Sequence, residues 1–325
     1  GWVWDTAVAR GLEPVQLGPV GRFSIKFVRE LARLARQRKA RLIHAHLLGS
    51  AVYGGLAGRL AGIPVVATFH GLTDLRAGDP FRLVRQSILR RSVDRIVLVS
   101  NALRAEVLAR TGYPAHRSEV IHNGIDLTRY RPGRDNVLRD RLGIGPEEWV
   151  IGALGNVRPA KAYEVLIQAA ARLGQLSRPW RIVIVGDTTG PTWPPLVELV
   201  RSLGLDDRVL FAGFEDDVPA TLRAFDLFAL SSRSEGFSLA TVQALATGLP
   251  IVATRSGGPE EILEGSGAGL LVTPDDPEAL AAALTTLSID PARCAAMTAR
   301  GPSHALARFS LETMLDKYQE LYRAL

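Results

Sequence analysis

Several features that define common protein classes are rare or absent in this 325-residue sequence. The single cysteine, Cys294, excludes an internal disulfide framework and makes the cytoplasm the expected location. No apolar run reaches the roughly 18–20 residues that a membrane-spanning helix needs. The six histidines show no zinc-ligand spacing, and aromatic residues are only 6%, with no nucleic-acid-binding motif. We therefore expect no metal site and no nucleic acid partner.

The composition that is present favours a globular protein. Hydrophobic residues make up 47% and charged residues 22%, which excludes extensive disorder. The length is sufficient for two domains of ordinary size. The formal net charge of +6 favours anionic partners such as nucleotides or anionic lipids.

The order of apolar segments predicts an α/β fold with two parallel sheets. Strand-like runs alternate with helical patterns at spacings typical of right-handed crossovers. A polar stretch with several prolines and glycines, residues 131–148, separates the two halves. The predicted domains are residues 1–144 and 145–307, followed by a terminal helix at 308–325. The predicted strands include Pro14–Leu17, Arg41–His46, Val65–Gly71, Ile96–Ser100, Glu119–Asp126, Arg181–Asp187, Val209–Phe214 and Ile251–Thr254.

Residues 23–39 predict an amphipathic helix. Its expected buried stripe consists of Phe23, Phe27, Leu31 and Leu34. A basic stripe lies roughly opposite and consists of Arg22, Lys26, Arg29, Arg33 and Arg36. Two interpretations of this Arg22–Arg36 stripe stay open. It is either a solvated helix face or a surface that binds anionic lipid at the inner face of a membrane.

The most informative stretch runs from Ser231 to Ile262 and reads SSRSEGFSLATVQALATGLPIVATRSGGPEEI. An apolar strand ends at its serines, a turn carries Glu235, and helical spacing follows over Leu239–Ala246. A second short strand, Ile251–Thr254, comes after the stop at Gly248 and Pro250. This order places an acid and backbone amides where a strand meets a helix N-terminus, where open α/β sheets bind phosphorylated ligands.

The same stretch resembles the signature of the retaining glycosyltransferases of family 4. Residues 235–240, Glu-Gly-Phe-Ser-Leu-Ala, match the family pattern Glu-Gly-Phe-Gly-Leu-Pro at four of six positions. The second acid of that pattern is replaced by Gln243. The trailing run matches at Gly248, Pro250, Val252, Ala253, Gly257, Gly258, Glu261 and Ile262. The resemblance implies a GT-B fold: two Rossmann-like domains that face each other across a cleft, with the C-terminal helix crossing back to the first domain.

The resemblance also implies a set of site residues. Arg158 and Lys161, three residues apart after a strand end, would hold the diphosphate of a nucleotide-sugar donor. Glu235 would contact hydroxyls of the transferred sugar, and His70 would lie beside that sugar. The expected donor-binding residues are Gly155, Asn156, Phe237, Ser238, Leu239 and Gln243. Three of these assignments have a non-functional alternative. Arg158 and Lys161 could be a surface charge pair, Glu235 a helix N-terminal acid, and His70 a strand-end histidine. His46 and His122 are interpreted as structural.

The expected chemistry is sugar transfer without a metal or cofactor. Negative charge grows on the leaving phosphate, and no Asp-x-Asp triplet is present to hold a divalent ion, so protein cations would stabilise that charge. The acceptor would be a saccharide, a lipid-linked sugar or a small molecule. The resemblance implies that the family's acid at the position of Gln243 accepts hydrogen bonds from both ribose hydroxyls of the nucleotide. Gln243 keeps one acceptor oxygen but loses the charge, so it is expected to weaken binding. The alternatives are a catalytically impaired nucleotide-sugar-binding or scaffold protein and an epimerase of the same fold.

One departure concerns the start of the sequence. Members of the resembled family begin with a strand, a glycine-rich turn, a helix and a second strand, whereas this sequence opens with a short helical pattern from Trp2. Either the sequence is a fragment, or its first domain is built differently. A fragment is the favoured explanation, and it is expected to bind nucleotide-sugar weakly, through the second domain, and to transfer little sugar.

Overall fold

The computed structural model describes residues 2–18, 23–72, 75, 80–174, 176 and 178–325. These form two compact units. The first contains residues 1–69, 73–97 and 107–119, and the second contains residues 70–72, 98–106 and 120–325. None of the helices in the described ranges combines the length and apolarity needed to cross a bilayer.

The first sheet has four strands in the order β1-β2-β3-β4, with β1 parallel to β2 from the Ile43–Val65 pair onward. β2 is fully buried, which explains its uninterrupted apolar sequence. The elements around this sheet are α1 (Trp2–Ala9), α2 (Ile25–Gln37), β1 (Ile43–His46), α3 (Leu47–Ala61), β2 (Val65–Phe69), α4 (Arg82–Ser92), β3 (Arg95–Leu98), α5 (Asn101–Thr111), η1 (Ala115–Arg117) and β4 (Ser118–Val120).

Two predictions about this half of the chain are wrong. Pro14–Leu17 forms no strand, because Pro14 lacks an amide hydrogen and the segment pairs with no neighbouring strand in the described part of the chain. The strand expected over Glu119–Asp126 ends at Val120. The turn after it leaves the sheet, and Ile125 instead forms a bridge with Ser310.

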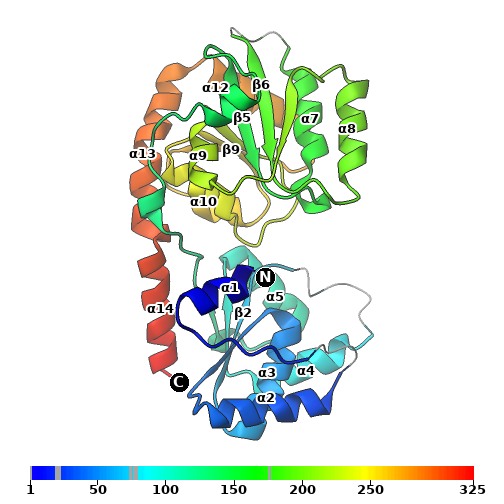
Figure 1. Ribbon diagram of the computed structural model, residues 1–325, viewed down its shortest axis with the longest axis vertical. Helices are drawn as coiled ribbons and strands as arrows, with labels where there is room; N and C mark the ends of the chain where they lie inside the picture. Colours follow the sequence, from blue (N-terminus) through cyan, green and yellow to red (C-terminus); the bar gives the residue numbers. More distant parts are fainter. Residues whose placement is uncertain (1, 19–22, 73–74, 76–79, 175, 177) are drawn as a thin grey trace. The chain divides into compact units, whose positions relative to one another are not determined.

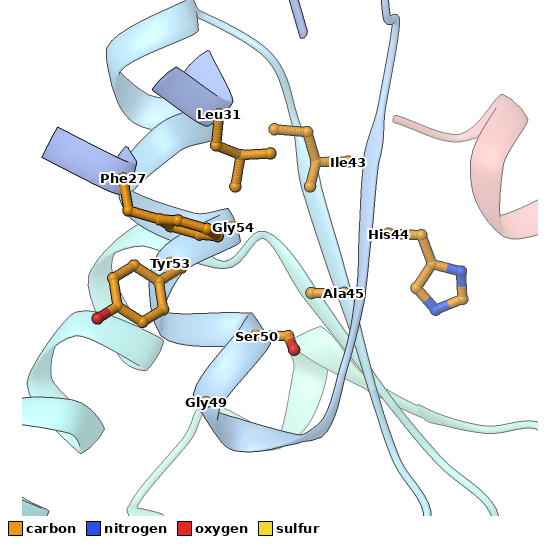
Figure 2. Close-up of a pocket in the computed structure, with 9 residues that line it drawn as sticks. All are labelled: Phe27, Leu31, Ile43, His44, Ala45, Gly49, Ser50, Tyr53 and Gly54. Atoms are coloured by element: carbon orange, nitrogen blue, oxygen red, sulfur yellow. The ribbon is translucent and has the colours of Figure 1, made fainter. Parts of the chain in front are cut away.

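The buried face of helix α2 is shifted by one residue from the predicted stripe, and Leu31 of that stripe packs against the core. Its buried residues are Val28, Ala32 and Ala35, and α2 packs beside α3. The contact consists of Val28 and Ala32 of α2 with Ala57 of α3, and the larger Tyr53 and Leu56 pack against it. The buried glycines of α3 lie against the strands and the end of α4 instead. Phe23 is 57% exposed, while Phe27 and Leu31 line a cavity of about 500 Å³ between α2, β1 and α3 (Figure 2).

The basic side chains on α2 lie on its exposed surface. Lys26, Arg29, Arg33 and Arg36 are all exposed, as the sequence pattern predicts. Arg22, the first member of the predicted stripe, lies outside the described residues.

The second sheet has six strands in the order β10-β9-β8-β5-β6-β7, and every pair of neighbours is parallel. Figure 1 shows α7 and α8 side by side against this sheet. Its elements are η2 (Leu127–Arg129), α6 (Val137–Arg141), β5 (Trp149–Leu154), η3 (Pro159–Lys161), α7 (Tyr163–Arg172), β6 (Trp180–Val185), α8 (Trp193–Ser202), β7 (Val209–Gly213), α9 (Val218–Arg223), β8 (Leu227–Leu230), α10 (Leu239–Ala246), β9 (Ile251–Thr254), α11 (Gly258–Leu263), β10 (Gly269–Val272), α12 (Pro277–Ser288), α13 (Pro291–Phe309) and α14 (Leu311–Arg323).

Local sequence signals explain where these helices begin. The side chains of Asp217, Asp276, Asp290 and Ser310 each accept a hydrogen bond from a backbone amide in the first turn of the helix that follows. Such caps satisfy amides that have no partner inside the helix. The described structure therefore confirms the prediction of two parallel α/β sheets. The boundaries 1–144, 145–307 and 308–325 stay predictions.

Candidate active site

The strand order of the second sheet contains a topological switch point between β5 and β8. From β5 the chain continues to β6 on one side, and from β8 it continues to β9 on the other. β5 lies between β8 and β6, and the connections of β5 and β8 run in opposite directions along the sheet. Ligands of open α/β sheets bind at such points, outside the carboxyl ends of the strands. The segments that leave β5 and β8 here are residues 155–161 and 231–235.

An ion pair joins these two segments. Lys161 Nζ donates to Glu235 Oε1 at 2.8 Å, and Ser232 Oγ donates to the same oxygen at 2.6 Å. The side chains of Lys161 and Glu235 are 20% and 13% exposed. Two donors therefore hold the Glu235 carboxylate in a mostly buried position. Its other oxygen, Oε2, accepts no hydrogen bond from the described part of the chain.

Backbone hydrogen bonds fix the position of the lysine. Ser231 Oγ donates to the Lys161 carbonyl at 2.9 Å, and the Arg233 amide donates to the Ala160 carbonyl at 2.8 Å. Ala162, where the resembled family usually has glycine, adopts left-handed backbone angles with φ 47°. This turn directs the chain from η3 into α7, so the Lys161 side chain is held at the end of β8.

Tyr163 and Gly155 complete the wall beside Lys161. Tyr163 Oη donates to the Gly155 carbonyl at 2.7 Å. Burial, and then the negative charge of Glu235, raise the pKa of Tyr163, so its hydroxyl keeps its proton at neutral pH. Gly155 has φ 151°, and a Cβ there would lie 2.8 Å from Lys161 Cε, which explains the need for glycine at this position.

Three further glycines bring backbone segments into direct contact around Glu235. A Cβ on Gly236 would lie 2.1 Å from the His70 carbonyl oxygen. Gly257 pairs with Glu235 in a parallel bridge, and a Cβ on Gly258 would lie 2.7 Å from Phe237 Cα. The backbone of the Glu-Gly-Phe segment is thus enclosed by other backbone on two sides.

The start of α10 offers hydrogen-bond donors next to Glu235. Ser238 is the N-cap, and its Oγ accepts from the Thr241 amide at 3.3 Å. Among the residues that the structure describes, the amides of Phe237, Ser238 and Leu239 donate to no protein group. Amides at a helix N-terminus attract anions, so this arrangement suits a phosphate or a sugar hydroxyl.

Arg158 and Asn156 occupy different surroundings from Lys161. Within the described ranges, the exposed Arg158 side chain makes no hydrogen bond or ion pair. Asn156 Oδ1 accepts from the Asp187 amide at 3.1 Å, which places this residue in a structural turn. Hydrogen bonds from Thr189 and then the charge of Arg158 lower the pKa of Asp187. The structure therefore joins Lys161 with Glu235, but not Arg158 with either.

His70 and Gln243 lie in the same compact unit as Glu235. The His70 side chain is exposed, and its backbone is the neighbour of Gly236 described above. Gln243 Nε2 donates to Tyr130 Oη at 2.8 Å. Tyr130 has no predicted role, because a single tyrosine 113 residues from Gln243 in the chain belongs to no recognisable pattern.

A second, partly buried carboxylate, Glu261, belongs to the trailing run of the motif, but its role could not be predicted from the sequence. It accepts hydrogen bonds from the Asn101 and Ala102 amides, at 2.9 and 2.8 Å, and lies 3.1 Å from His122 Nε2. Burial by itself raises the pKa of Glu261, but the bonds from His122 and the two amides outweigh burial and hold the pKa at about 2. The His122 ring stacks on Phe237 with centroids 5.4 Å apart. His122 thus connects Glu261 to the Glu-Gly-Phe segment, and its structural role stays a prediction.

Comparisons with known proteins agree with this geometry. The family model of "Glycosyl transferases group 1" matches residues 135–304, and that of "Glycosyltransferase Family 4" matches residues 5–129. The D-inositol 3-phosphate glycosyltransferase of Rhodococcus opacus is 35% identical over 298 residues, covering 87% of this chain and 67% of the relative. That of Salinispora tropica is also 35% identical, with 86% and 64% covered. The chain spans about two thirds of the length of these curated relatives.

Solved structures show the same architecture. The Anabaena protein HepE in complex with UDP-glucose is 27% identical, has a TM-score of 0.87, and matches over 99% of this chain and 89% of its own. A glycosyltransferase from Rickettsia africae has a TM-score of 0.89 at 20% identity, and the match covers 100% of this chain and 88% of that protein's chain. At this identity the likeness shows the fold alone. The predicted GT-B assignment is confirmed, and the chain belongs to the family of group 1 glycosyl transferases.

Proposed function

We propose that this chain is a retaining, metal-independent glycosyltransferase that moves a sugar from a nucleotide-sugar donor to a saccharide, lipid or small-molecule acceptor. The observation that carries the proposal is the Lys161–Glu235 ion pair at the point between β5 and β8, 2.8 Å long and next to the amides at the start of α10. A cation, a carboxylate and free amides are the groups that a sugar diphosphate needs.

The proposed mechanism assigns each group a separate task. As the bond between the anomeric carbon and the diphosphate breaks, negative charge grows on the leaving phosphate oxygen. Lys161, with Arg158 from the same loop, and the amides of Phe237, Ser238 and Leu239 would stabilise this charge. Glu235 would accept hydrogen bonds from sugar hydroxyls, and His70 would donate to one. In a retaining reaction, the acceptor oxygen bonds to the anomeric carbon on the face that the diphosphate leaves, and a phosphate oxygen takes the acceptor's proton.

The first test measures transfer and its stereochemistry. UDP-, GDP- and ADP-glucose are offered with glucose or D-inositol 3-phosphate, acceptors suggested by what HepE binds and by the names of the relatives. We expect one donor to raise the melting temperature and to give product slowly, with the donor's anomeric configuration by proton NMR, with or without EDTA. Inversion would overturn the retaining mechanism, and loss of activity in EDTA would overturn metal independence. Binding without transfer or donor hydrolysis would favour the scaffold protein.

The exposed basic side chains of α2 support a separate proposal, that this helix binds anionic membranes. Lys26, Arg29, Arg33 and Arg36 share one exposed surface, and each basic residue near an anionic bilayer contributes about 1 kcal/mol. Charge reversal at Arg29 and Arg33 is expected to reduce co-sedimentation with liposomes that contain phosphatidylserine, and 0.5 M salt is expected to have the same effect. Reversal of Arg172 and Arg201, exposed arginines of the second unit, is the matched control. Equal sedimentation with neutral and anionic liposomes would contradict the proposal.

A further inference from the structure

We propose that Tyr130 is a positioning residue for nucleotide binding: its hydroxyl accepts the amide N–H of Gln243 and turns the Gln243 carbonyl oxygen toward the ribose hydroxyls. This inference rests on the proposed function, because it concerns the nucleotide half of the same site. Gln243 Nε2 and Tyr130 Oη are 2.8 Å apart, and both side chains are partly buried.

Both members of the pair are held by the backbone around them. Gln243 lies in the middle of α10, and its own carbonyl accepts from the Thr247 amide at 3.0 Å. The Tyr130 amide donates to the Leu127 carbonyl at 3.2 Å at the end of η2, and the Asp126 side chain caps that turn. The contact therefore connects two segments whose positions are set independently.

The hydroxyl of Tyr130 suits this task at physiological pH. Burial raises the pKa of Tyr130, while the bond with Gln243 and the charge of Arg129 act in the opposite direction. The phenol thus stays neutral, and its oxygen lone pair is available to the amide N–H.

An amide needs this orientation, whereas a carboxylate does not. Glutamine has one acceptor oxygen and one NH₂ group, so a rotation of 180° about its last bond would present donors to the ribose instead of an acceptor. A glutamate has two equivalent oxygens, and either rotation presents an acceptor. Tyr130 should therefore matter when residue 243 is glutamine and matter little when it is glutamate.

This contrast defines a double-mutant cycle. Wild-type protein, Tyr130→Phe, Gln243→Glu and the double variant are titrated with UDP, GDP and ADP by calorimetry, since all three carry the same ribose. The 2′,3′-dideoxy form of the nucleotide that binds serves as a second probe without ribose hydroxyls. Tyr53→Phe is the control, because Tyr53 Oη accepts a hydrogen bond from the Ser24 amide in the other compact unit. Circular dichroism establishes that each variant is folded.

We expect Tyr130→Phe to raise the Kd about fivefold in the glutamine background and less than twofold in the glutamate background. The dideoxy probe should show no difference between wild type and Tyr130→Phe. Equal losses in both backgrounds, or with the dideoxy probe, would show that Tyr130 acts through packing and would overturn the inference. An unchanged Kd in Tyr130→Phe would also overturn it while leaving the proposed function intact. Binding of no nucleotide by the wild type would overturn both.

Discussion

Replacing Lys161 by alanine is expected to lower sugar transfer at least about tenfold and to reduce the stability of the protein as well. The ammonium group carries both effects, because it is proposed to hold the diphosphate and it pairs with Glu235 at 2.8 Å. Without Lys161, the Glu235 carboxylate keeps the Ser232 bond but loses its counter-charge while 13% exposed. Leaving such a group underpaired costs about 1–3 kcal/mol.

Two companion variants separate these effects. Arg158→Ala should also lower transfer about tenfold or more, but should leave the melting temperature unchanged, since its exposed side chain makes no ion pair among the described residues. Adding Glu235→Gln to Lys161→Ala removes the unpaired charge and should restore stability without restoring transfer. Transfer is measured with the nucleotide-sugar identified by the donor panel, and stability by thermal unfolding. Wild-type transfer in Lys161→Ala would remove this lysine from the mechanism.

The second large effect is a loss of folding stability at low pH that depends on Glu261. The pKa of this carboxyl is about 2 in the folded protein and near 4.5 when unperturbed. The folded state therefore favours the ionised form, and the resulting stability is present above pH 4.5 and lost as the pH falls from about 4.5 to 2. The difference between these two pKa values corresponds to roughly 3 kcal/mol. Glu261→Gln should lower the free energy of unfolding by about this amount at pH 7.

Urea unfolding followed by tryptophan fluorescence between pH 2 and pH 7 tests this expectation. The variant's stability should depend less on pH between about 4.5 and 2 than that of the wild type. Glu278→Gln is the matched control, since Glu278 is an exposed acid in the first turn of α12. If Glu261→Gln and the wild type lose stability in parallel over this range, the hydrogen bonds to the Asn101 and Ala102 amides do not hold the carboxylate in its ionised form.

The local elements of the second sheet could be predicted because their signals are contiguous. Helix α10 and strand β9 have the predicted limits, since a serine cap, helical spacing, a glycine and a proline mark them in order. Helix α2 shows where this approach fails. Large apolar residues were assigned to its core face, but the helix is turned by one residue, so that Val28, Ala32 and Ala35 take the buried positions.

Contacts between candidate site residues were predictable where the order of the strands determines which loops are neighbours. Contacts that depend on one pair of side chains distant in sequence were not predictable. Glu235 and Lys161 follow strands that lie side by side, so motif and topology indicate the same place. The partners of Gln243 and Glu261 are one tyrosine and one histidine, 113 and 139 residues away in the chain. No periodicity connects such pairs, and only the folded backbone brings them together. Whether Arg158 contacts a phosphate stays a prediction.

The close backbone contacts of Gly236, Gly257 and Gly258 have a consequence for redesign of the enzyme. Saturation mutagenesis at these three positions should return almost only inactive clones, because any Cβ there would displace backbone rather than a flexible side chain. A library intended to alter the proposed ribose contact is better directed at positions 130 and 243, where two side chains meet. Variation would then be confined to the side chains proposed to face the ribose, and the backbone around Glu235 would be inherited unchanged by every member of the library.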